Sequence, residues 1–261
     1  MERITARTND KIKYASLLAS SASKRRESGE FLLEGARLCA DAAACSVEIV
    51  RSFFTSDALG KYSSYISVIT DACPECYEIT PEVASRLSDT GSSQGVFCVC
   101  RMRECSYALK STDRCIALEN LQDPSNVGAV IRSAEAIGID ALIVSGGCDI
   151  YNPKVLRAAM GSAMRMNIIQ CDSLPAFIEK SKTGGFVSFA CVVSGEAEDI
   201  RNTGALAGEK GIICCIGNEG NGLTDETVNA CDYRVTIPMQ GKAESLNAAA
   251  AASIAAWELK R

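Results

Sequence analysis

The sequence predicts an α/β protein whose C-terminal part forms a parallel sheet covered by helices on both faces, preceded by a smaller α/β domain. Continuous apolar runs of strand length alternate with helical segments, as is typical of strands buried in a parallel sheet. The alternation stops at RECSYALKSTD (103–113) and then restarts, and 261 residues suffice for two cores. We therefore expect domains at residues 1–102 and 114–261, joined by a linker at 103–113.

In the first domain, apolar spacing and turn signals predict an alternation of helices and strands. The expected helices cover residues 9–27, 36–45, 57–64 and a segment that begins at Thr80 and Pro81. The expected strands cover residues 31–35, 47–55, 66–69 and 95–102.

In the second domain the same signals are cleaner. The expected strands cover residues 115–120, 141–145, 167–171, 186–193, 211–217 and 233–238. The expected helices cover residues 127–137, 153–163, 173–183 and 244–259, with a further helix capped by Thr224. Ligands of such sheets bind at the carboxyl ends of the strands, so the loops that follow strands are the candidate site. One of these loops, residues 194–201, is only polar.

Composition limits the chemistry that is available. The chain has no histidine, which excludes Ser-His and Cys-His nucleophiles, histidine metal ligands and the commonest general base. Its fourteen cysteines are scattered through apolar runs, and we expect buried thiols rather than disulfides. The single CxxC, Cys73 to Cys76, lacks a second pair at metal-site spacing and indicates a turn around Pro74. We expect no metal.

Charge and hydropathy predict a cytoplasmic protein with no membrane segment. The apolar runs are too short to span a bilayer, and the first residues lack the features of a signal peptide. A net charge of −5 argues against indiscriminate binding of polyanions. Two local basic groups suit either a solvated face or a contact with RNA. They are Arg3, Arg7, Lys11, Lys13, Lys24, Arg25 and Arg26, and later Arg101, Arg103, Lys110 and Arg114.

The loop at residues 121–126 leads into a helix with an unexpected arginine. Asn126 alone is explained as the N-cap of a helix that begins near Val127. Arg132 lies six positions later among small and apolar residues, where packing does not explain it, and its long side chain could reach the ligand side. The stretch lacks the G-x-G-x-x-G pattern of a dinucleotide site.

Two further loops combine turn residues with unusual polar groups. The segment IGNEGNGLT (216–224) packs three glycines around Glu219; a turn explains the glycines, but not an acid at the mouth of an apolar sheet. Ser245 and Asn247 open an alanine-rich helix, where Ser245 suits an N-cap and the pair also suits hydrogen bonds to a polar substrate. Alanine on every side predicts close packing of this helix against the sheet or a partner subunit.

The segments PSNVGAVIRSAEA, IGNEGNGL and IPMQGKAESLNAAAAASI occur in this order and resemble the three motifs of the SpoU/TrmH branch of the SPOUT RNA methyltransferases. The segments ITARTNDKIKYASLL, FLLEGARL and SSQGVFCV are similar, more loosely, to the ribosomal-protein-like RNA-binding domain that often precedes the catalytic one. The resemblance implies methyl transfer from S-adenosylmethionine to a ribose 2′-hydroxyl in RNA. The two-domain layout favours 23S ribosomal RNA over transfer RNA as the substrate. The resemblance also implies a SPOUT domain with a deep trefoil knot and a homodimer through that domain.

The resemblance also implies roles for individual residues. The adenosyl group is expected on the backbone of Gly217, Ile237 and Leu246, with Met239 and Gly241 nearby. Catalytic roles are expected for Asn126, Arg132, Glu219, Ser245 and Asn247.

Arg132 is the family's proposed base, but a guanidinium stays protonated at any ordinary pH. The alternative is that Arg132 pins the target phosphate and stabilises the developing alkoxide, while phosphate or water takes the proton. Asn126 would orient the arginine or the ribose, and Glu219 would position the RNA or the arginine.

Two other classes of protein stay open at this point. A non-catalytic RNA-binding protein would use the same basic N-terminal domain, but would have no reason to bind S-adenosylmethionine at micromolar concentration. A nicotinamide-dependent oxidoreductase would share the doubly wound sheet, although the glycine fingerprint of its cofactor site is missing.

Overall fold

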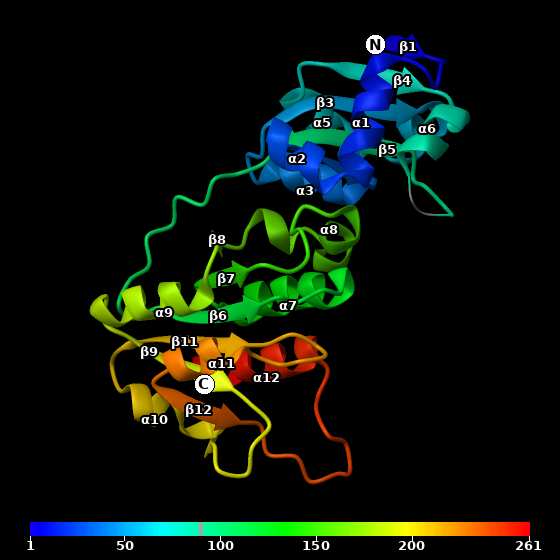
Figure 1. Cartoon of the computed structure of the whole chain (residues 1–261). Coiled ribbons are helices and arrows are strands. Elements are labelled where there is room, and N and C mark those ends of the chain that lie inside the picture. Colours follow the sequence, from blue (N-terminus) through cyan, green and yellow to red (C-terminus); the bar gives the residue numbers. More distant parts are fainter. Residues whose placement is uncertain (89–90) are drawn as a thin grey trace. The chain divides into compact units, whose positions relative to one another are not determined.

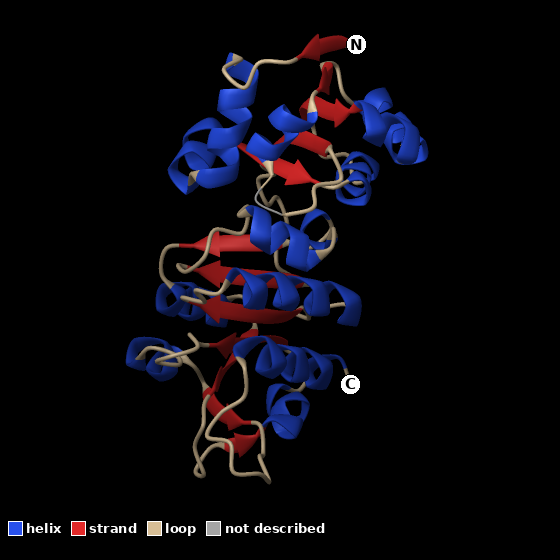
Figure 2. Cartoon of the chain, turned by 90° about the vertical axis from the view of Figure 1, so that its right-hand side faces the viewer, coloured by secondary structure: helices blue, strands red, loops and turns tan. Residues whose placement is uncertain are grey.

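The computed structural model of the protein describes residues 1–88 and 91–261, which form two compact units (Figure 1). Unit 1 comprises Met1–Glu104 and Asp149–Met164, and unit 2 comprises Cys105–Cys148 and Arg165–Arg261. Each unit contains a sheet with helices packed on it (Figure 2). Among the helices described, none combines the length and apolar character needed to cross a membrane.

Unit 1 is built on a mixed sheet with the strand order β1-β4-β3-β5-β2. Its strands are β1 (Glu2–Ile4), β2 (Glu30–Glu34), β3 (Ile49–Thr55), β4 (Cys76–Ile79) and β5 (Val96–Arg101). Its helices are α1 (Asp10–Ser20), α2 (Ala22–Ser28), α3 (Ala36–Ala44), α4 (Ser56–Lys61), α5 (Ser63–Ala72), α6 (Pro81–Leu87), α8 (Pro153–Ala159) and the 3-10 turn η1 (Ser162–Met164). Strand β3 pairs parallel with β4 and antiparallel with β5, and β2 pairs antiparallel with β5.

Alternation along the strands of unit 1 builds a separate core on each face of the sheet. Leu33 and Phe54 belong to a cluster that includes residues of α3 and α5. Their neighbours Leu32 and Phe53 belong to a second cluster, which includes residues of α1 and α6. Because successive side chains of a strand point to opposite faces, apolar pairs such as Phe53 and Phe54 bury both faces.

Two sequence predictions for unit 1 are wrong. Residues 66–69 are not a strand but part of α5, where Ile66 and Ile69 are buried three positions apart on one side of the helix. The predicted helix at 9–27 is two helices, since Ser21 ends α1 and its hydroxyl accepts a hydrogen bond from Lys24 N at the start of α2. The edge strand β1 and strand β4 had not been predicted.

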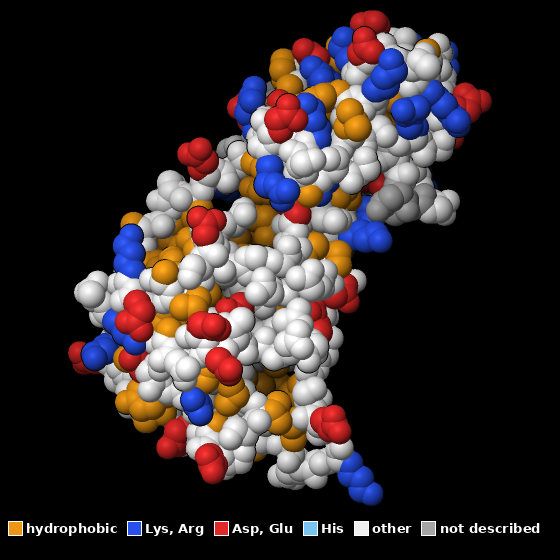
Figure 3. Space-filling view, viewed as in Figure 1, with side chains coloured by type: hydrophobic (Ala, Val, Ile, Leu, Met, Phe, Trp, Pro, Cys, Tyr) orange, Lys and Arg blue, Asp and Glu red, His pale blue; other side chains and the backbone are white. Residues whose placement is uncertain are grey.

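Arg25 belongs to the basic group that was predicted to form either a solvated face or a contact with RNA, and for Arg25 neither prediction holds because it is buried. Its side chain is 2% exposed, donates to Leu18 O at 2.6 Å and forms a 2.6 Å ion pair with Asp149. Separating Arg25 from Asp149 would leave a buried charge without its partner, which costs about 3–5 kcal/mol of folding stability. Arg25 is therefore a structural residue. On the face of unit 1 shown in Figure 3, Lys and Arg side chains are interspersed with Asp and Glu. Several form ion pairs, including Arg3 with Glu78 and Lys24 with Glu27.

The fourteen cysteines are free thiols, and half of them are buried. Cys73 and Cys76 flank a bend at Pro74, where the Cys76 thiol donates to Cys73 O and the Cys73 thiol donates to Glu75 O. Burial raises the pKa of Cys73 to about 11, so the thiol is a poor nucleophile. Across residues 1–88 and 91–261, no group of three or more His, Cys, Asp or Glu side chains is placed to hold a metal ion.

Unit 2 contains a sheet with the strand order β10-β12-β9-β11-β6-β7-β8, in which all recorded pairs are parallel. Its strands are β6 (Arg114–Glu119), β7 (Ala141–Ser145), β8 (Ile168–Cys171), β9 (Phe186–Cys191), β10 (Glu198–Asp199), β11 (Gly211–Ile216) and β12 (Tyr233–Thr236). Its helices are α7 (Pro124–Ile137), α9 (Leu174–Thr183), η2 (Ile200–Asn202), α10 (Thr203–Ala207), α11 (Asp225–Ala230) and α12 (Ala248–Lys260). The predicted parallel sheet is confirmed.

Helices cover both faces of this sheet. Cys115 and Ile213 of the central strands join a cluster with residues of α9 and α11. Alternate strand residues such as Ile116 and Cys214 point to the opposite face, where α12 contacts β6, β11 and α7. Helix α12 approaches closely because its packed face is alanine, as its sequence predicted. The buried alanines are Ala248, Ala249, Ala252, Ala255 and Ala256.

Candidate active site

Strands β6 and β11 are parallel neighbours, with Leu118 opposite Ile216 at their carboxyl ends. The two loops that follow these strands therefore start side by side, at the edge where open α/β sheets bind ligands. The Asn218 side-chain amide spans them by donating to Asn120 O at 2.7 Å. Residue pairs about a hundred positions apart in the chain thus come into direct contact.

Gly217, the first residue after β11, occupies a position that only glycine fits. A Cβ atom there would lie 2.1 Å from the carbonyl carbon of Gly222 and 2.1 Å from Leu223 N. Asn218 and Gly222 exchange backbone hydrogen bonds of 2.9 and 3.0 Å, which fold the loop back onto its own beginning. Gly217 therefore permits close backbone approach, whereas Gly222 adopts a positive φ of 69° that favours glycine.

Glu219 joins this loop to the one after β6. Its carboxylate accepts hydrogen bonds from the Asn126 side-chain amide at 2.8 Å, from Gln122 N at 3.3 Å and from Asp123 N at 3.4 Å. The acid that looked anomalous in the sequence thus satisfies two backbone donors at the start of α7. A carboxylate suits this place because it only accepts hydrogen bonds and can accept several.

Asn126 connects Glu219 with the C-terminal segment. It is 8% exposed, and its side-chain oxygen accepts a 3.0 Å hydrogen bond from the Asn247 amide. The Asn247 oxygen in turn accepts from Ala249 N and Ala250 N at the start of α12. A continuous series of hydrogen bonds therefore runs from Glu219 through Asn126 to Asn247 and joins the three segments.

The helix caps differ from those expected. Asp123, not Asn126, caps α7, and the helix begins at Pro124 because proline suits the first helical position. Asn247, not Ser245, caps α12. Asn126 is thereby released from capping and Ser245 lies outside the helix, so the plain structural explanation of either residue as an N-cap does not apply.

The pKa of the Glu219 carboxyl is lowered from its ordinary value. Partial burial acts to raise this pKa, but hydrogen bonds from the Asn126 amide, from its own backbone amide and from Gln122 N and Asp123 N outweigh burial. The carboxylate is therefore ionised at neutral pH, in a site with no histidine to share a proton.

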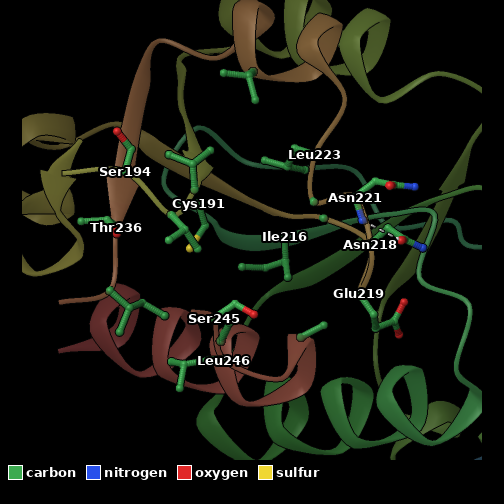
Figure 4. Close-up of a pocket in the computed structure, with 18 of the residues that line it drawn as sticks. Cys191, Ser194, Ile216, Asn218, Glu219, Asn221, Leu223, Thr236, Ser245 and Leu246 are labelled. Carbon is green, nitrogen blue, oxygen red and sulfur yellow. Dashed lines mark hydrogen bonds between the residues drawn. The ribbon is translucent and has the colours of Figure 1, made fainter. Parts of the chain in front are cut away.

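A cavity of about 540 Å³ opens beside these loops. Six of the residues singled out from the sequence line it: Gly217, Glu219, Ile237, Met239, Ser245 and Leu246. Figure 4 shows Glu219, Asn218 and Asn221 on one side of the cavity, Cys191, Ser194 and Thr236 on the other, and Ile216 and Leu223 between them. Gly241, Asn126 and Asn247 are not in its lining.

One wall of the cavity was not predicted from the sequence. Residues 191–194 at the end of β9 line it, although the loop that begins at Ser194 had been judged only polar. Thr236 at the end of β12 lines it as well. Residues 191–194 and Thr236 both lie where ligands bind in parallel sheets, at the carboxyl ends of strands. That rule is enough to indicate the loop after β9, whereas its polar composition gives no signal.

Arg132 lies in the middle of α7, with an exposed side chain. It is two turns beyond the first residues of the helix and is not part of the cavity lining. No hydrogen bond or ion pair is recorded for its guanidinium within the described part of the chain, so the group is available to an incoming anion.

Fold and site together define an α/β protein with a ligand cavity at the carboxyl edge of a parallel sheet. Residues 113–257 match the model of the SpoU rRNA Methylase family, and residues 9–98 match that of the MRM3-like substrate binding domain. The first match spans more than half of the chain. The chain therefore belongs to the SpoU rRNA methylase family, and it is an RNA methyltransferase rather than a non-catalytic binding protein or an oxidoreductase.

Known relatives and solved structures are similar to this chain over all or nearly all of its length. The chain is 28% identical to the 23S rRNA (guanosine(2553)-2′-O)-methyltransferase RlmP of Bacillus subtilis (strain 168), with all of both chains covered. It superposes with a TM-score of 0.85 and 25% identity on the SpoU methyltransferase AviRb of Streptomyces viridochromogenes in complex with AdoMet, covering 97% of each chain. An AdoMet-bound rRNA methyltransferase from Sinorhizobium meliloti gives a TM-score of 0.86 and 25% identity, with 99% of this chain and 97% of that one covered.

We predict that Glu219 stabilises the protein at neutral pH but not in acid. Its pKa is lower in the folded chain than in the unfolded chain, where it is about 4.3, so the stabilisation is present above that value and is lost as pH falls through the folded pKa. The difference in Tm between the wild type and Glu219→Gln should be present at pH 7 and shrink below pH 4. Glu226→Gln, which changes an exposed carboxylate of α11, is the control. A Tm difference constant from pH 7 to pH 3 would contradict the role of the ionised carboxylate.

Proposed function

We propose that the protein transfers a methyl group from S-adenosylmethionine to a ribose 2′-hydroxyl of 23S ribosomal RNA. The observation that supports this most strongly is the meeting of three segments, residues 120–126, 217–224 and 245–247, around one cavity edge. The full-length similarity to a Bacillus subtilis enzyme named for 23S rRNA supports the substrate class.

The cavity suits an adenosyl donor in size and chemistry. Its volume of about 540 Å³ falls in the range of roughly 300–1,000 Å³ that small ligands occupy. Ile216, Leu223 and Leu246 offer apolar surface for a base, and Glu219 places a negative charge on the side of the cavity where Asn218 and Asn221 lie. Bound S-adenosylmethionine would supply a methyl group on a positively charged sulfur, which a nearby carboxylate favours.

The adenosyl group would rest on backbone rather than on charged side chains. Gly217, Ile237 and Leu246 would provide these contacts, with Met239 adjoining them in the cavity lining. Gly241 lies outside the lining, so the proposed donor contacts are those of the other four residues.

The polar residues would divide the work of aligning the ribose. Arg132, with its exposed guanidinium, would hold the target phosphate and stabilise the alkoxide, while phosphate or water takes the proton. Asn126 would orient the arginine or the ribose. Glu219 and Asn247 would keep Asn126 in place through the hydrogen bonds they share with it, and Ser245 would contribute its hydroxyl at the cavity wall.

RNA binding and methyl transfer would be carried out by different parts of the chain. Residues 1–102 would bind the RNA, residues 103–113 would act as a linker, and residues 114–261 would carry out the transfer in the cytoplasm. The match of residues 9–98 to a substrate binding domain supports the first assignment.

The methyltransferase domain would act as a homodimer with a knotted C-terminus. Ile254 and Trp257 lie three positions apart on α12 with exposed fractions of 36% and 63%, and such an apolar pair suits a contact with a second copy. The proposed trefoil knot rests on the match of residues 113–257 to the SpoU rRNA Methylase family.

Mapping of 2′-O-methylated nucleotides tests the proposed substrate. We expect one site in 23S rRNA to lose its methyl group when the gene is removed and to regain it when the gene is restored. A lost site in transfer RNA would instead establish the alternative substrate. Unchanged methylation of both RNAs, while the purified protein binds S-adenosylmethionine, would refute the assigned substrate class.

We predict that Arg132→Ala retains binding of S-adenosylmethionine and loses methyl transfer by orders of magnitude. The guanidinium lies outside the cavity lining, so its removal leaves the donor site intact while the phosphate and alkoxide lose their partner. Calorimetry measures donor binding, and single-turnover methylation of RNA measures transfer. Arg132→Lys should rescue only part of the activity, because an ammonium lacks the planar pair of donors. Near-normal turnover of Arg132→Ala would remove Arg132 from the mechanism.

We predict that Trp257→Glu converts the dimer to a monomer, because a charge would be buried in an apolar contact. Light scattering should show half the mass of the wild type, and methylation activity should fall with it. Lys180→Glu, an exposed change on α9, is the control and should stay dimeric. A dimeric Trp257→Glu would exclude this face of α12 as the interface.

A further inference from the structure

We propose that Glu119 is a positioning residue that holds one wall of the donor cavity in place. Glu119 is the last residue of β6, and its side chain is 5% exposed. Its carboxylate accepts hydrogen bonds from Thr224 N at 2.8 Å, from the Thr224 hydroxyl at 3.0 Å and from the Thr227 hydroxyl. All three donors belong to the beginning of α11 or to the residue that caps it.

Among the residues that the structure describes, the hydrogen-bond partners recorded for the Glu119 carboxylate are these three donors. None of the ion pairs recorded for residues 1–88 and 91–261 includes Glu119. A buried carboxylate without a cation depends on its hydrogen bonds, and it would be costly to leave it unsatisfied. The position of Thr224 and Thr227 relative to β6 is therefore closely specified.

Thr227 is fully buried, and its hydroxyl donates to Glu119 rather than to solvent. Its exposed fraction is 0%, and its backbone N donates to the Thr224 hydroxyl, which is the N-cap of α11. The carboxylate thus fastens the cap and the first turn of the helix together. The contact spans 105 positions to Thr224 and 108 to Thr227, so it is a tertiary contact between the end of β6 and the beginning of α11.

The beginning of α11 matters because it continues the cavity wall. Residues 217–223 line the cavity, and Thr224 is the next residue. Asp225 and Val228 of α11 also line it. Gly217 is held at the end of β11 and Glu219 is held by the loop after β6, so Glu119 supplies a third fixed point, where this loop passes into α11.

This inference rests on the proposed function, because the wall is taken to contact the donor. Loss of the Glu119 carboxylate should weaken binding of S-adenosylmethionine at least tenfold. It should leave the affinity for RNA unchanged, since the basic residues of the N-terminal region lie elsewhere in the sequence. A residue needed only for folding would not separate the two affinities.

Four variants test the inference. Glu119→Ala removes the acceptor. Glu119→Gln preserves it, because the glutamine oxygen can accept from Thr224 N while its amide donates to a threonine hydroxyl, which can rotate to accept. Thr227→Val keeps the buried shape and removes one donor. Glu226→Ala changes an exposed carboxylate of the same helix and is the control.

The expected result is a graded loss of donor affinity. Calorimetry should give Glu119→Ala a Kd for S-adenosylmethionine at least tenfold above that of the wild type, Thr227→Val a smaller increase, and Glu119→Gln and Glu226→Ala values within about threefold. Hydrogen exchange of residues 218–227 without ligand should be faster in Glu119→Ala than in the wild type.

Two outcomes would overturn the inference. One is a wild-type Kd and wild-type hydrogen exchange in Glu119→Ala, or in Thr227→Val should Glu119→Ala not fold. The other is Glu119→Gln impaired as much as Glu119→Ala, which would assign the effect to the charge rather than to the acceptor. If the wild type itself failed to bind S-adenosylmethionine, the proposed function would fail, and hydrogen exchange would still decide whether Glu119 fixes this wall.

Discussion

The parallel pairing of β6 with β11 is the constraint on which the site depends. It sets Leu118 opposite Ile216, so the two following loops leave the sheet at the same height. The loop after β11 can approach the other only because Gly217 has no Cβ atom. Once the loops are in contact, side chains of one satisfy the backbone of the other, as Glu219 does for Gln122 and Asp123.

The carboxylates of Glu119 and Glu219 both hold segments of the site together by accepting hydrogen bonds, but their surroundings differ. Glu119 is buried and bonded to two threonines, whereas Glu219 is at the cavity rim and bonded to backbone amides and to Asn126. Within residues 1–88 and 91–261 no ion pair is recorded for either carboxylate, and hydrogen bonds keep both in place. A negative rim also explains why the glycine-rich loop does not suit a polyphosphate, in spite of its composition.

Local signals predicted many elements well. Strand β7 and the start of α6 match the sequence predictions. A continuous apolar run is typical of a buried parallel strand, and a threonine N-cap followed by proline is typical of the first turn of a helix. Residues 66–69 were assigned wrongly because a short apolar run is ambiguous between strand and helix. The spacing of Ile66 and Ile69, three positions apart, is the helical signal that the shorter window hid.

Six of the candidate residues proposed from the sequence line the cavity, but the hydrogen-bond partners of the candidates were not predicted. Asn126 and Ser245 had a sufficient local explanation as caps, and only the structure shows that Asp123 and Asn247 cap these helices instead. Arg25 looked like its exposed neighbour Arg26 in the sequence, yet it is buried against Asp149, which lies 124 positions away.

The sequence by itself determined the residue types at the site, the alternation of strands and helices, and the exclusion of histidine chemistry, because these depend on composition and local spacing. Only the tertiary structure decided which polar groups meet. Glu219 and Gln122 are 97 positions apart, and Glu119 and Thr227 are 108 apart. Such contacts follow from the pairing of strands distant in the chain, which local spacing does not encode. The sequence therefore identifies Glu219 as an unusual residue. Only the fold shows that its carboxylate links the loop after β11 to the loop after β6.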